Sequence, residues 1–239
     1  MIETPAIVIS TIKYGDSSLI ANCYTKSNGV KGYMLNGILK SKKRNINKAL
    51  FQPFSLISII SDHRKKEKLN YIKEVRVNKP ITSIHNSILK TSITLFLSEV
   101  LKSVLQEEGG RNENLYNFLE TMALWLDRNN ANPNFHIKFL IELTRYMGFY
   151  PNSSNIHYQC FDLSTGCFTN NSNSKNILLG KDLKNFKKIL GMNFEGIEML
   201  NWNKSVRNSL LNEIIRYYSI HLQRFKTPKS LSILHEIFK

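Results

Sequence analysis

Apolar residues are spaced differently in the first eighty residues of the chain than in the remainder. In the first part they form short runs, rich in β-branched residues and bounded by turn residues, which is typical of strands. The segment Ser27-Asn28-Gly29 supplies the positive φ angles that a tight hairpin needs. The predicted strands cover residues 6–12, 19–25, 30–39, 54–60 and 69–77.

Five short strands favour a small closed barrel over a β-sandwich, which usually has about seven strands. Gly32 and Gly37 mark bends at which a strand can coil around such a barrel. We therefore expect a five-stranded barrel of the oligonucleotide/oligosaccharide-binding (OB) type over residues 1–80.

After residue 80, apolar residues recur every three or four positions, which predicts amphipathic helices. The first helix is expected to begin after Ser83, a suitable N-cap, and to end at Gly109-Gly110. Asn132-Pro133 marks the start of a third helix, and Gly148 marks its end. The other predicted helices cover residues 115–126, 181–190, 204–225 and 228–238.

A stretch rich in serine and asparagine, at about residues 150–180, interrupts the helical pattern and contains one short hairpin around Phe161 and Phe168. The apolar fraction of 42% lies in the globular range, so the chain can bury a core. The sequence therefore predicts an α+β protein, with an OB-fold barrel over residues 1–80. An all-helical domain over residues 81–239 follows it and carries the irregular insertion.

The chain carries a net charge of +15, with 33 Lys and Arg against 18 Asp and Glu. Such an excess usually indicates a polyanionic partner, either nucleic acid or an anionic membrane surface. A proteome rich in Lys and Asn throughout is the alternative explanation. The chain has no run of ~18 uncharged apolar residues, no signal peptide and no disulfide framework among its three cysteines. We therefore expect a cytoplasmic protein that does not enter a membrane.

Two basic clusters lie in the connections between predicted strands. If both connections reach one surface of the barrel, their cations can neutralise phosphates and release counterions from a nucleic acid. Lysine outnumbers arginine, which suits contact with the phosphate backbone more than reading of base edges. A solvated loop is the alternative for either cluster. The predicted DNA-binding residues are Lys40, Lys42, Lys43, Arg44 and Lys48 in the first cluster and Arg64, Lys65, Lys66 and Lys68 in the second.

Aromatic side chains on the strands are candidates for stacking on bases. Because successive side chains on a strand point to opposite faces, about half of these rings must point into the barrel. The sequence leaves open which of them do. The candidates are Tyr14, Tyr24, Tyr33, Phe51 and Tyr71.

The group His157, Cys160 and Cys167 falls short of a structural zinc site, which needs four ligands and commonly has two Cys-x-x-Cys knuckles. We expect these cysteines to be buried apolar residues of a hairpin, with no metal bound. The chain also lacks a phosphate-binding loop, a dinucleotide fingerprint, a His-Glu-x-x-His motif and a nucleophile elbow. We therefore expect a protein that is not an enzyme and binds no cofactor.

Several short segments, taken in order, resemble RecO proteins. A Tyr-Gly-Asp turn precedes a strand that ends in Thr-x-x-x-Gly, and a glycine-then-basic segment and a Pro-containing strand entry follow. Later, a helix ends in Leu-x-x-x-x-Gly-x-x-Pro. The segments are residues 9–20 (ISTIKYGDSSLI), 24–29 (YTKSNG), 37–42 (GILKSK), 50–54 (LFQPF), 143–151 (LTRYMGFYP), 218–222 (YSIHL) and 229–231 (KSL). The similarity spans nearly the whole chain, and the order and spacing of the segments carry it.

The resemblance implies an OB fold plus a helical domain that binds single- and double-stranded DNA. It also implies a protein that anneals complementary strands coated with single-stranded-DNA-binding protein and that, with RecR, helps load RecA. Lys40, Lys42 and Lys43 match the basic segment of the family, which makes them the best candidates for DNA contact. Many RecO proteins carry four cysteines after the Gly-x-x-Pro, whereas this chain keeps two at a different spacing.

Three arginines flank apolar faces of the predicted C-terminal helices and suggest a pocket for the acidic tail of a partner protein: Arg207, Arg216 and Arg224. Two other functions remain open at this point. One is a nucleic-acid enzyme, such as a nuclease or a modifying enzyme, with an OB-type binding domain. The other is an interaction scaffold whose charge reflects its proteome. Oligomeric state and the preference for single or double strands are also open.

Overall fold

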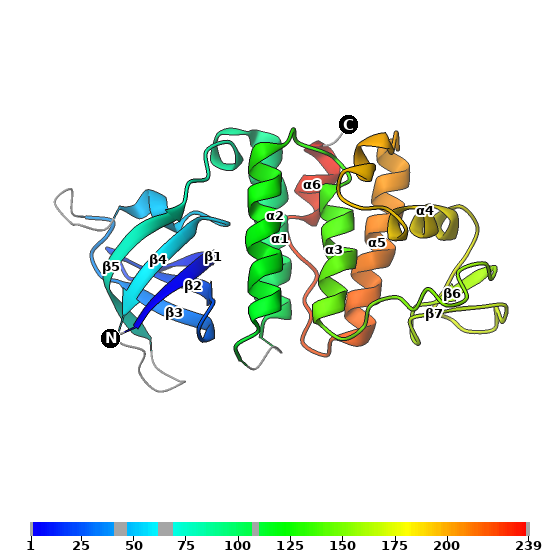
Figure 1. Cartoon of the computed structure of the whole chain (residues 1–239), viewed down its shortest axis with the longest axis horizontal. Helices are drawn as coiled ribbons and strands as arrows, with labels where there is room; N and C mark the ends of the chain where they lie inside the picture. The colour runs from blue at the N-terminus through cyan, green and yellow to red at the C-terminus, as the bar shows by residue number, and fades with distance from the viewer. Residues whose placement is uncertain (1, 41–46, 62–68, 107–109, 238–239) are drawn as a thin grey trace. The chain divides into compact units, whose positions relative to one another are not determined.

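The computed structural model describes residues 2–40, 47–61, 69–106 and 110–237 (Figure 1). It divides into two compact units, Met1–Asn130 and Ala131–Lys239. In the described ranges, no helix combines the length and the apolar character that crossing a membrane requires. The predicted α+β class, with a barrel first and helices after it, is confirmed.

Five strands of the first unit close into a barrel, shown in blue to cyan in Figure 1. Around the barrel the strands follow the order β1-β2-β3-β5-β4, and all neighbours are antiparallel except β3 and β5. This confirms the predicted OB-type barrel. The predicted third strand, residues 30–39, extends too far, because the chain turns after Leu35. The strands are β1 (Ile2–Tyr14), β2 (Ser18–Thr25), β3 (Gly29–Leu35), β4 (Leu56–Ser61) and β5 (Asn70–Lys79).

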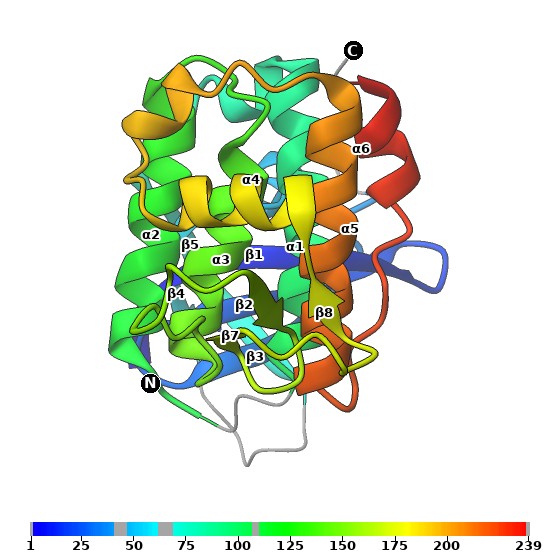
Figure 2. The same ribbon diagram turned by 90° about the vertical axis from the view of Figure 1, so that its right-hand side faces the viewer.

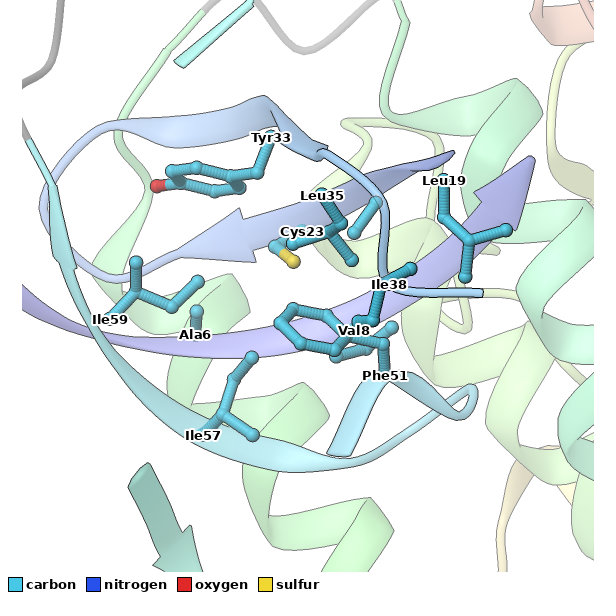
Figure 3. Close-up of a cluster of buried hydrophobic side chains, with 11 residues drawn as sticks. Ala6, Val8, Leu19, Cys23, Tyr33, Leu35, Ile38, Phe51, Ile57 and Ile59 are labelled. Carbon is cyan, nitrogen blue, oxygen red and sulfur yellow. The ribbon is translucent and has the colours of Figure 1, made fainter. Parts of the chain in front are cut away.

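Side chains from one side of β1, β2, β3 and β4 fill the barrel interior, as Figure 3 shows, and Ile72 and Val75 on β5 pack against them. On β2, for example, Leu19, Ala21 and Cys23 alternate with residues that point away from this cluster. The short 3-10 helix η1 (Lys48–Phe51) contributes Phe51, which closes the interior between β3 and β4. Burial of this kind raises the pKa of the Cys23 thiol well above its usual range. The interior cluster comprises Ala6, Val8, Leu19, Ala21, Cys23, Tyr33, Leu35, Ile38, Phe51, Ile57 and Ile59.

One outer face of the barrel is covered by helices of the same unit. Ile7 lies opposite both Tyr24 and Leu56, and all three are fully buried although none belongs to the interior cluster. Helix α1 (Ile88–Val104) packs against β1, and the Tyr24 hydroxyl donates a hydrogen bond (3.3 Å) to the carbonyl oxygen of Asn112. We call Ile7, Tyr24 and Leu56 the covered face.

Three further contacts tie the barrel to helix α2 (Glu113–Arg128) and the segment before it. Lys26 pairs with Glu113 (3.1 Å), and Lys79 pairs with Glu120 (2.7 Å). At Gly29, which has φ +65°, a Cβ atom would lie 2.2 Å from the carbonyl oxygen of Gly110, so the hairpin accepts only glycine there. These contacts explain why the first unit continues to Asn130, past the change from strands to helices at residue 80.

The first long helix begins at Ile88 and not directly after Ser83 as predicted. A 3-10 turn, η2 (Ile84–Asn86), comes first, because the Asp127 carboxylate accepts hydrogen bonds from the backbone N–H groups of Ser83 (2.7 Å) and Ile84 (3.0 Å). The buried Lys90 ammonium donates to the Ser83 hydroxyl and to the carbonyl oxygen of Asp127. Ser83 therefore anchors this turn to the end of α2, and Ser87 is the N-cap of α1.

In its described residues, the second unit contains four α-helices and a small sheet, and Figure 2 shows α4 lying across α3 and α5. The third helix of the chain, α3, begins at Phe135, later than the predicted start at Asn132-Pro133, because the Asn132 side chain instead accepts from the N–H of Asn134 (2.8 Å). The elements are α3 (Phe135–Tyr146), β6 (Cys160–Asp162), β7 (Cys167–Thr169), β8 (Ile177–Leu178), α4 (Gly180–Leu190), η3 (Gly196–Met199), α5 (Lys204–His221) and α6 (Leu231–Ile237).

Candidate nucleic-acid interface

The first basic cluster begins on a segment that the barrel holds in place. After β3, the N–H of Leu39 donates to the carbonyl oxygen of Ser17 (2.9 Å), and the N–H of Gly37 donates to the Ser18 hydroxyl (3.1 Å). These bonds hold the segment that carries the exposed Lys40 beside the turn between β1 and β2. The other end of the cluster, Lys48, is exposed at the first position of η1.

The central cations of the first cluster and the whole second cluster lie outside the described residues. The barrel does define where the second cluster joins it, because β5 begins at Asn70, directly after Lys68 and Leu69. Asn70 lies opposite Tyr33 in the parallel pairing of β3 with β5, and its side-chain amide donates to the carbonyl oxygen of Gly32 (3.2 Å). The residues outside the described ranges are Lys42, Lys43, Arg44, Arg64, Lys65, Lys66 and Lys68.

The two basic clusters are therefore attached to adjoining strand ends. β3 ends at Leu35, two residues beyond Tyr33, and β5 starts at the partner of Tyr33. Because β3 and β5 are parallel, however, the chain leaves β3 at the end of the barrel that holds the turn between β1 and β2, and it enters β5 from the opposite end, where β1 begins. The strand topology therefore brings the two attachment points side by side without placing both clusters on one rim.

Charge is distributed unevenly over the barrel. Strands β2 and β3 contain no Asp or Glu, so nothing on them repels a phosphate. The acidic partners Glu113 and Glu120 lie on α2, and Glu74, on β5, pairs with Arg76 (2.9 Å). In the described ranges, Lys40 and Lys48 have no carboxylate within ion-pair distance. Strands β2 and β3 therefore form the acid-free part of the barrel, and the ion pairs named above involve β5 and α2.

Of the five aromatic candidates, three are buried and two are exposed. Tyr33 and Phe51 belong to the interior cluster, and Tyr24 is buried on the covered face. Tyr14 is 56% exposed at the end of β1, and Tyr71 is 52% exposed near the start of β5. The sequence could not separate the two groups, because all five lie in strand-like or barrel-closing segments of similar composition.

The three arginines of the second unit are not gathered into one group. Arg207 is buried and donates a hydrogen bond to the carbonyl oxygen of Trp202. Arg216 donates to the carbonyl oxygen of Lys175 (2.9 Å) and lies nine residues further along α5, which is two and a half turns, so the two point to opposite sides. Arg224 is exposed after the end of α5. Their role in partner binding stays a prediction.

The small sheet of the second unit is packed around aromatic rings. Phe161 on β6 lies 4.9 Å from Phe168 on β7 and 4.8 Å from Phe186 on α4, measured between ring centroids. Cys160 lies opposite Thr169 in this hairpin, so the two cysteines are not paired across it. Over the described parts of the chain, no three His, Cys, Asp or Glu side chains are placed to hold a metal ion.

The largest pKa shifts occur in packed cores. Burial, and to a smaller extent the nearby Arg207 and His235, lower the pKa of His136 to about 3. Burial raises the pKa of Tyr33 and Tyr218 above the usual range. Because each of these groups is enclosed by its own core, the shifts reflect packing and mark no acid or base of a site.

Two family models match the chain in succession. One is described as "Recombination protein O N terminal" and matches residues 1–81, and the other as "Recombination protein O C terminal" and matches residues 85–231. The chain is 37% identical to the DNA repair protein RecO of Christiangramia forsetii, covering 100% of this chain and 99% of that protein. It is 41% identical to the same-named protein of Flavobacterium johnsoniae (99% of both chains) and 33% identical to that of Bacteroides fragilis (99% and 98%).

Proposed function

The chain belongs to the recombination protein O (RecO) family, and on that basis we propose that it is a DNA-repair protein that acts as a recombination mediator. In this proposal it binds single- and double-stranded DNA through its barrel and is not itself an enzyme. The relatives that it matches over their full length are DNA repair proteins by name.

The observation that carries the proposal is the acid-free pair of strands β2 and β3, next to which both basic clusters join the barrel. The first cluster follows β3 after Leu35, and the second precedes Asn70, the residue of β5 that pairs with Tyr33 on β3. Together they comprise Lys40, Lys42, Lys43, Arg44, Lys48, Arg64, Lys65, Lys66 and Lys68. Cations at this density neutralise phosphates of any sequence, which is what a mediator that must act at any break requires.

The mechanism that we propose is passive. A cationic surface that screens two phosphate backbones at once lowers the repulsion between complementary strands and holds them close enough to pair. Base pairing then supplies the free energy of annealing, so the reaction needs no hydrolysis of a nucleoside triphosphate. In the cell the strands would carry single-stranded-DNA-binding protein, and RecR would act with this protein to load RecA. For the acidic tail of a partner protein we propose contact with the exposed Arg216 and Arg224, because Arg207 is buried.

The test is annealing of two complementary labelled oligonucleotides by the purified chain, without nucleotide or metal, at low and moderate salt. We expect rapid annealing that slows as salt rises. The variant Lys42→Ala/Lys43→Ala/Arg44→Ala should anneal slowly, bind DNA of all sequences more weakly and show a salt slope shallower by roughly 0.7–0.9 for each lost phosphate contact.

A matched control removes the same charge from the other unit. Lys181, Lys184 and Lys188 are exposed on α4, and their triple alanine variant should anneal like the parent protein. If both triple variants are impaired to the same extent, net charge and not the barrel surface drives binding. Mg²⁺-dependent loss of a labelled strand would instead identify a nuclease. DNA affinity unaffected by either variant would favour an interaction scaffold.

A further inference from the structure

An outward-facing row of apolar side chains crosses four strands of the barrel. Ile12 on β1 lies opposite Ile20 on β2, Ile20 lies opposite Met34 on β3, and Met34 lies opposite Tyr71 on β5. Residues opposite each other on adjacent strands project from the same face of a sheet. We call Ile12, Ile20, Met34 and Tyr71 the apolar row.

The apolar row points away from the interior of the barrel. Its neighbours in sequence, Leu19 on β2 and Tyr33 and Leu35 on β3, belong to the interior cluster, and side chains alternate along a strand. Ile12 is 45% exposed and Tyr71 is 52% exposed, while Ile20 and Met34 are half-buried. With strands about 4.8 Å apart, the row spans about 14 Å, which is long enough for more than one nucleotide.

Cations border the apolar row, and the strands at its centre carry no acid. Lys40 lies on the segment held against the turn between β1 and β2 by the Leu39–Ser17 hydrogen bond. On β5, Lys73 is exposed two residues after Tyr71. Apolar surface flanked by positive charge matches a strand whose base faces and phosphates are both accessible.

We propose that the apolar row binds unpaired nucleobases, with the Tyr71 ring stacking on one of them, and that this gives the barrel a preference for single-stranded over double-stranded DNA. The inference rests on the proposed DNA-binding function and deepens it. Contacts to phosphates serve both forms of DNA, because both expose their backbones. The apolar row contributes only when bases are unstacked, because a duplex keeps the faces of its bases covered.

The experiment compares an oligothymidylate with an abasic phosphodiester of the same length and charge, by fluorescence anisotropy at fixed salt. We expect the full chain to bind the oligothymidylate about 5-fold or more tightly than the abasic strand. Tyr71→Ala should lose most of that ratio, whereas Tyr71→Trp should keep it, because a larger ring still stacks. Affinity for a duplex should be the same in all three proteins.

The matched control is Val77→Ala, which truncates a side chain on the same strand that is 54% exposed but lies outside the apolar row. It should keep the parent ratio, and thermal unfolding by circular dichroism should show all variants folded. Equal binding of the oligothymidylate and the abasic strand by the parent protein would overturn the inference alone and leave the row as a surface for a protein. Failure to bind either strand or the duplex would overturn the DNA-binding function as well.

Discussion

The barrel has two outward faces that are built from similar residues but differ in their exposure to solvent. The covered face, Ile7, Tyr24 and Leu56, and the apolar row, which ends in Tyr71, both consist of apolar side chains that alternate with the same interior cluster. Helices α1 and α2 belong to the unit that contains the covered face, and Tyr24 is fully buried. Tyr71 is half exposed on an acid-free side. The difference shows that covering, and not composition, separates a stabilising face from a binding face.

The largest effect that separates the two faces should be on stability. Tyr24→Ala removes a fully buried ring and should lower the free energy of unfolding of the first unit by about 3–5 kcal/mol. Tyr71→Ala should change it by less than about 0.5 kcal/mol, because its ring is half exposed. Urea denaturation in a Trp202→Phe background, followed by the fluorescence of Trp125 on α2, reports the first unit. Similar losses for the two variants would contradict the distinction.

The hairpin between β2 and β3 offers a second test of the covered side. Gly29→Ala should lower the free energy of unfolding by about 2–4 kcal/mol, because it adds a contact with the carbonyl oxygen of Gly110 to the strain of a positive φ. Gly15→Ala is the control, since Gly15 also has a positive φ (+60°) but has open space around it. Gly15→Ala should lower the free energy of unfolding by only about 1–2 kcal/mol. Equal losses would mean that the close approach to Gly110 contributes nothing.

The turn that leads from the barrel into α1 should depend on Asp127. Burial raises the pKa of this carboxyl, but hydrogen bonds from Ile84, Thr82 and Ser83 lower it more, so that it lies below the ordinary 3.8. The contribution of ionised Asp127 to stability is therefore fully present at pH values above its pKa in the unfolded state. It is lost as the pH falls through its pKa in the folded state. Asp127→Ala should lower the free energy of unfolding at pH 7 by about 1–3 kcal/mol.

The pH dependence of the same variant provides the check. Urea denaturation between pH 7 and pH 3 should show the parent protein approaching the variant at the acid end, because protonated Asp127 no longer favours the turn. Asp127→Asn keeps an acceptor oxygen and should fall between the two. A constant difference across this range would show that the carboxylate charge is unimportant.

The smallest stability effect concerns two lysines on β5. Lys79→Ala breaks the pair with Glu120 and should lower the free energy of unfolding by less than about 1 kcal/mol, and by less still at high salt. Lys73→Ala, near Tyr71, should also lower the free energy of unfolding by less than about 1 kcal/mol, but it should make the salt slope of DNA binding shallower by about 0.7–0.9. Anisotropy titrations at several salt concentrations measure the slope. If Lys79→Ala and not Lys73→Ala changed the salt slope, the DNA would bind near Lys79 and α2 instead of near the apolar row.

The sequence predicted the barrel because each strand leaves a local signal. The run Ala6-Ile7-Val8-Ile9 is apolar at every position, and the structure buries both of its sides, one in the barrel and one outside it. Helix starts were less accurate. Ser83 and Asn132 are suitable caps by residue type, but tertiary partners and local Asx geometry moved the starts to Ile88 and Phe135.

The order of apolar and polar residues determined the five strands, the helices and the clusters of positive charge, because these depend on neighbours within a few positions. Only the tertiary structure decided which tyrosine is part of a core and which faces solvent. Tyr24 is buried where the segment at Asn112, 88 positions along the chain, reaches it, whereas Tyr71 remains half exposed. Whether an outward-facing side chain is covered depends on such distant contacts, and a period of two cannot encode them.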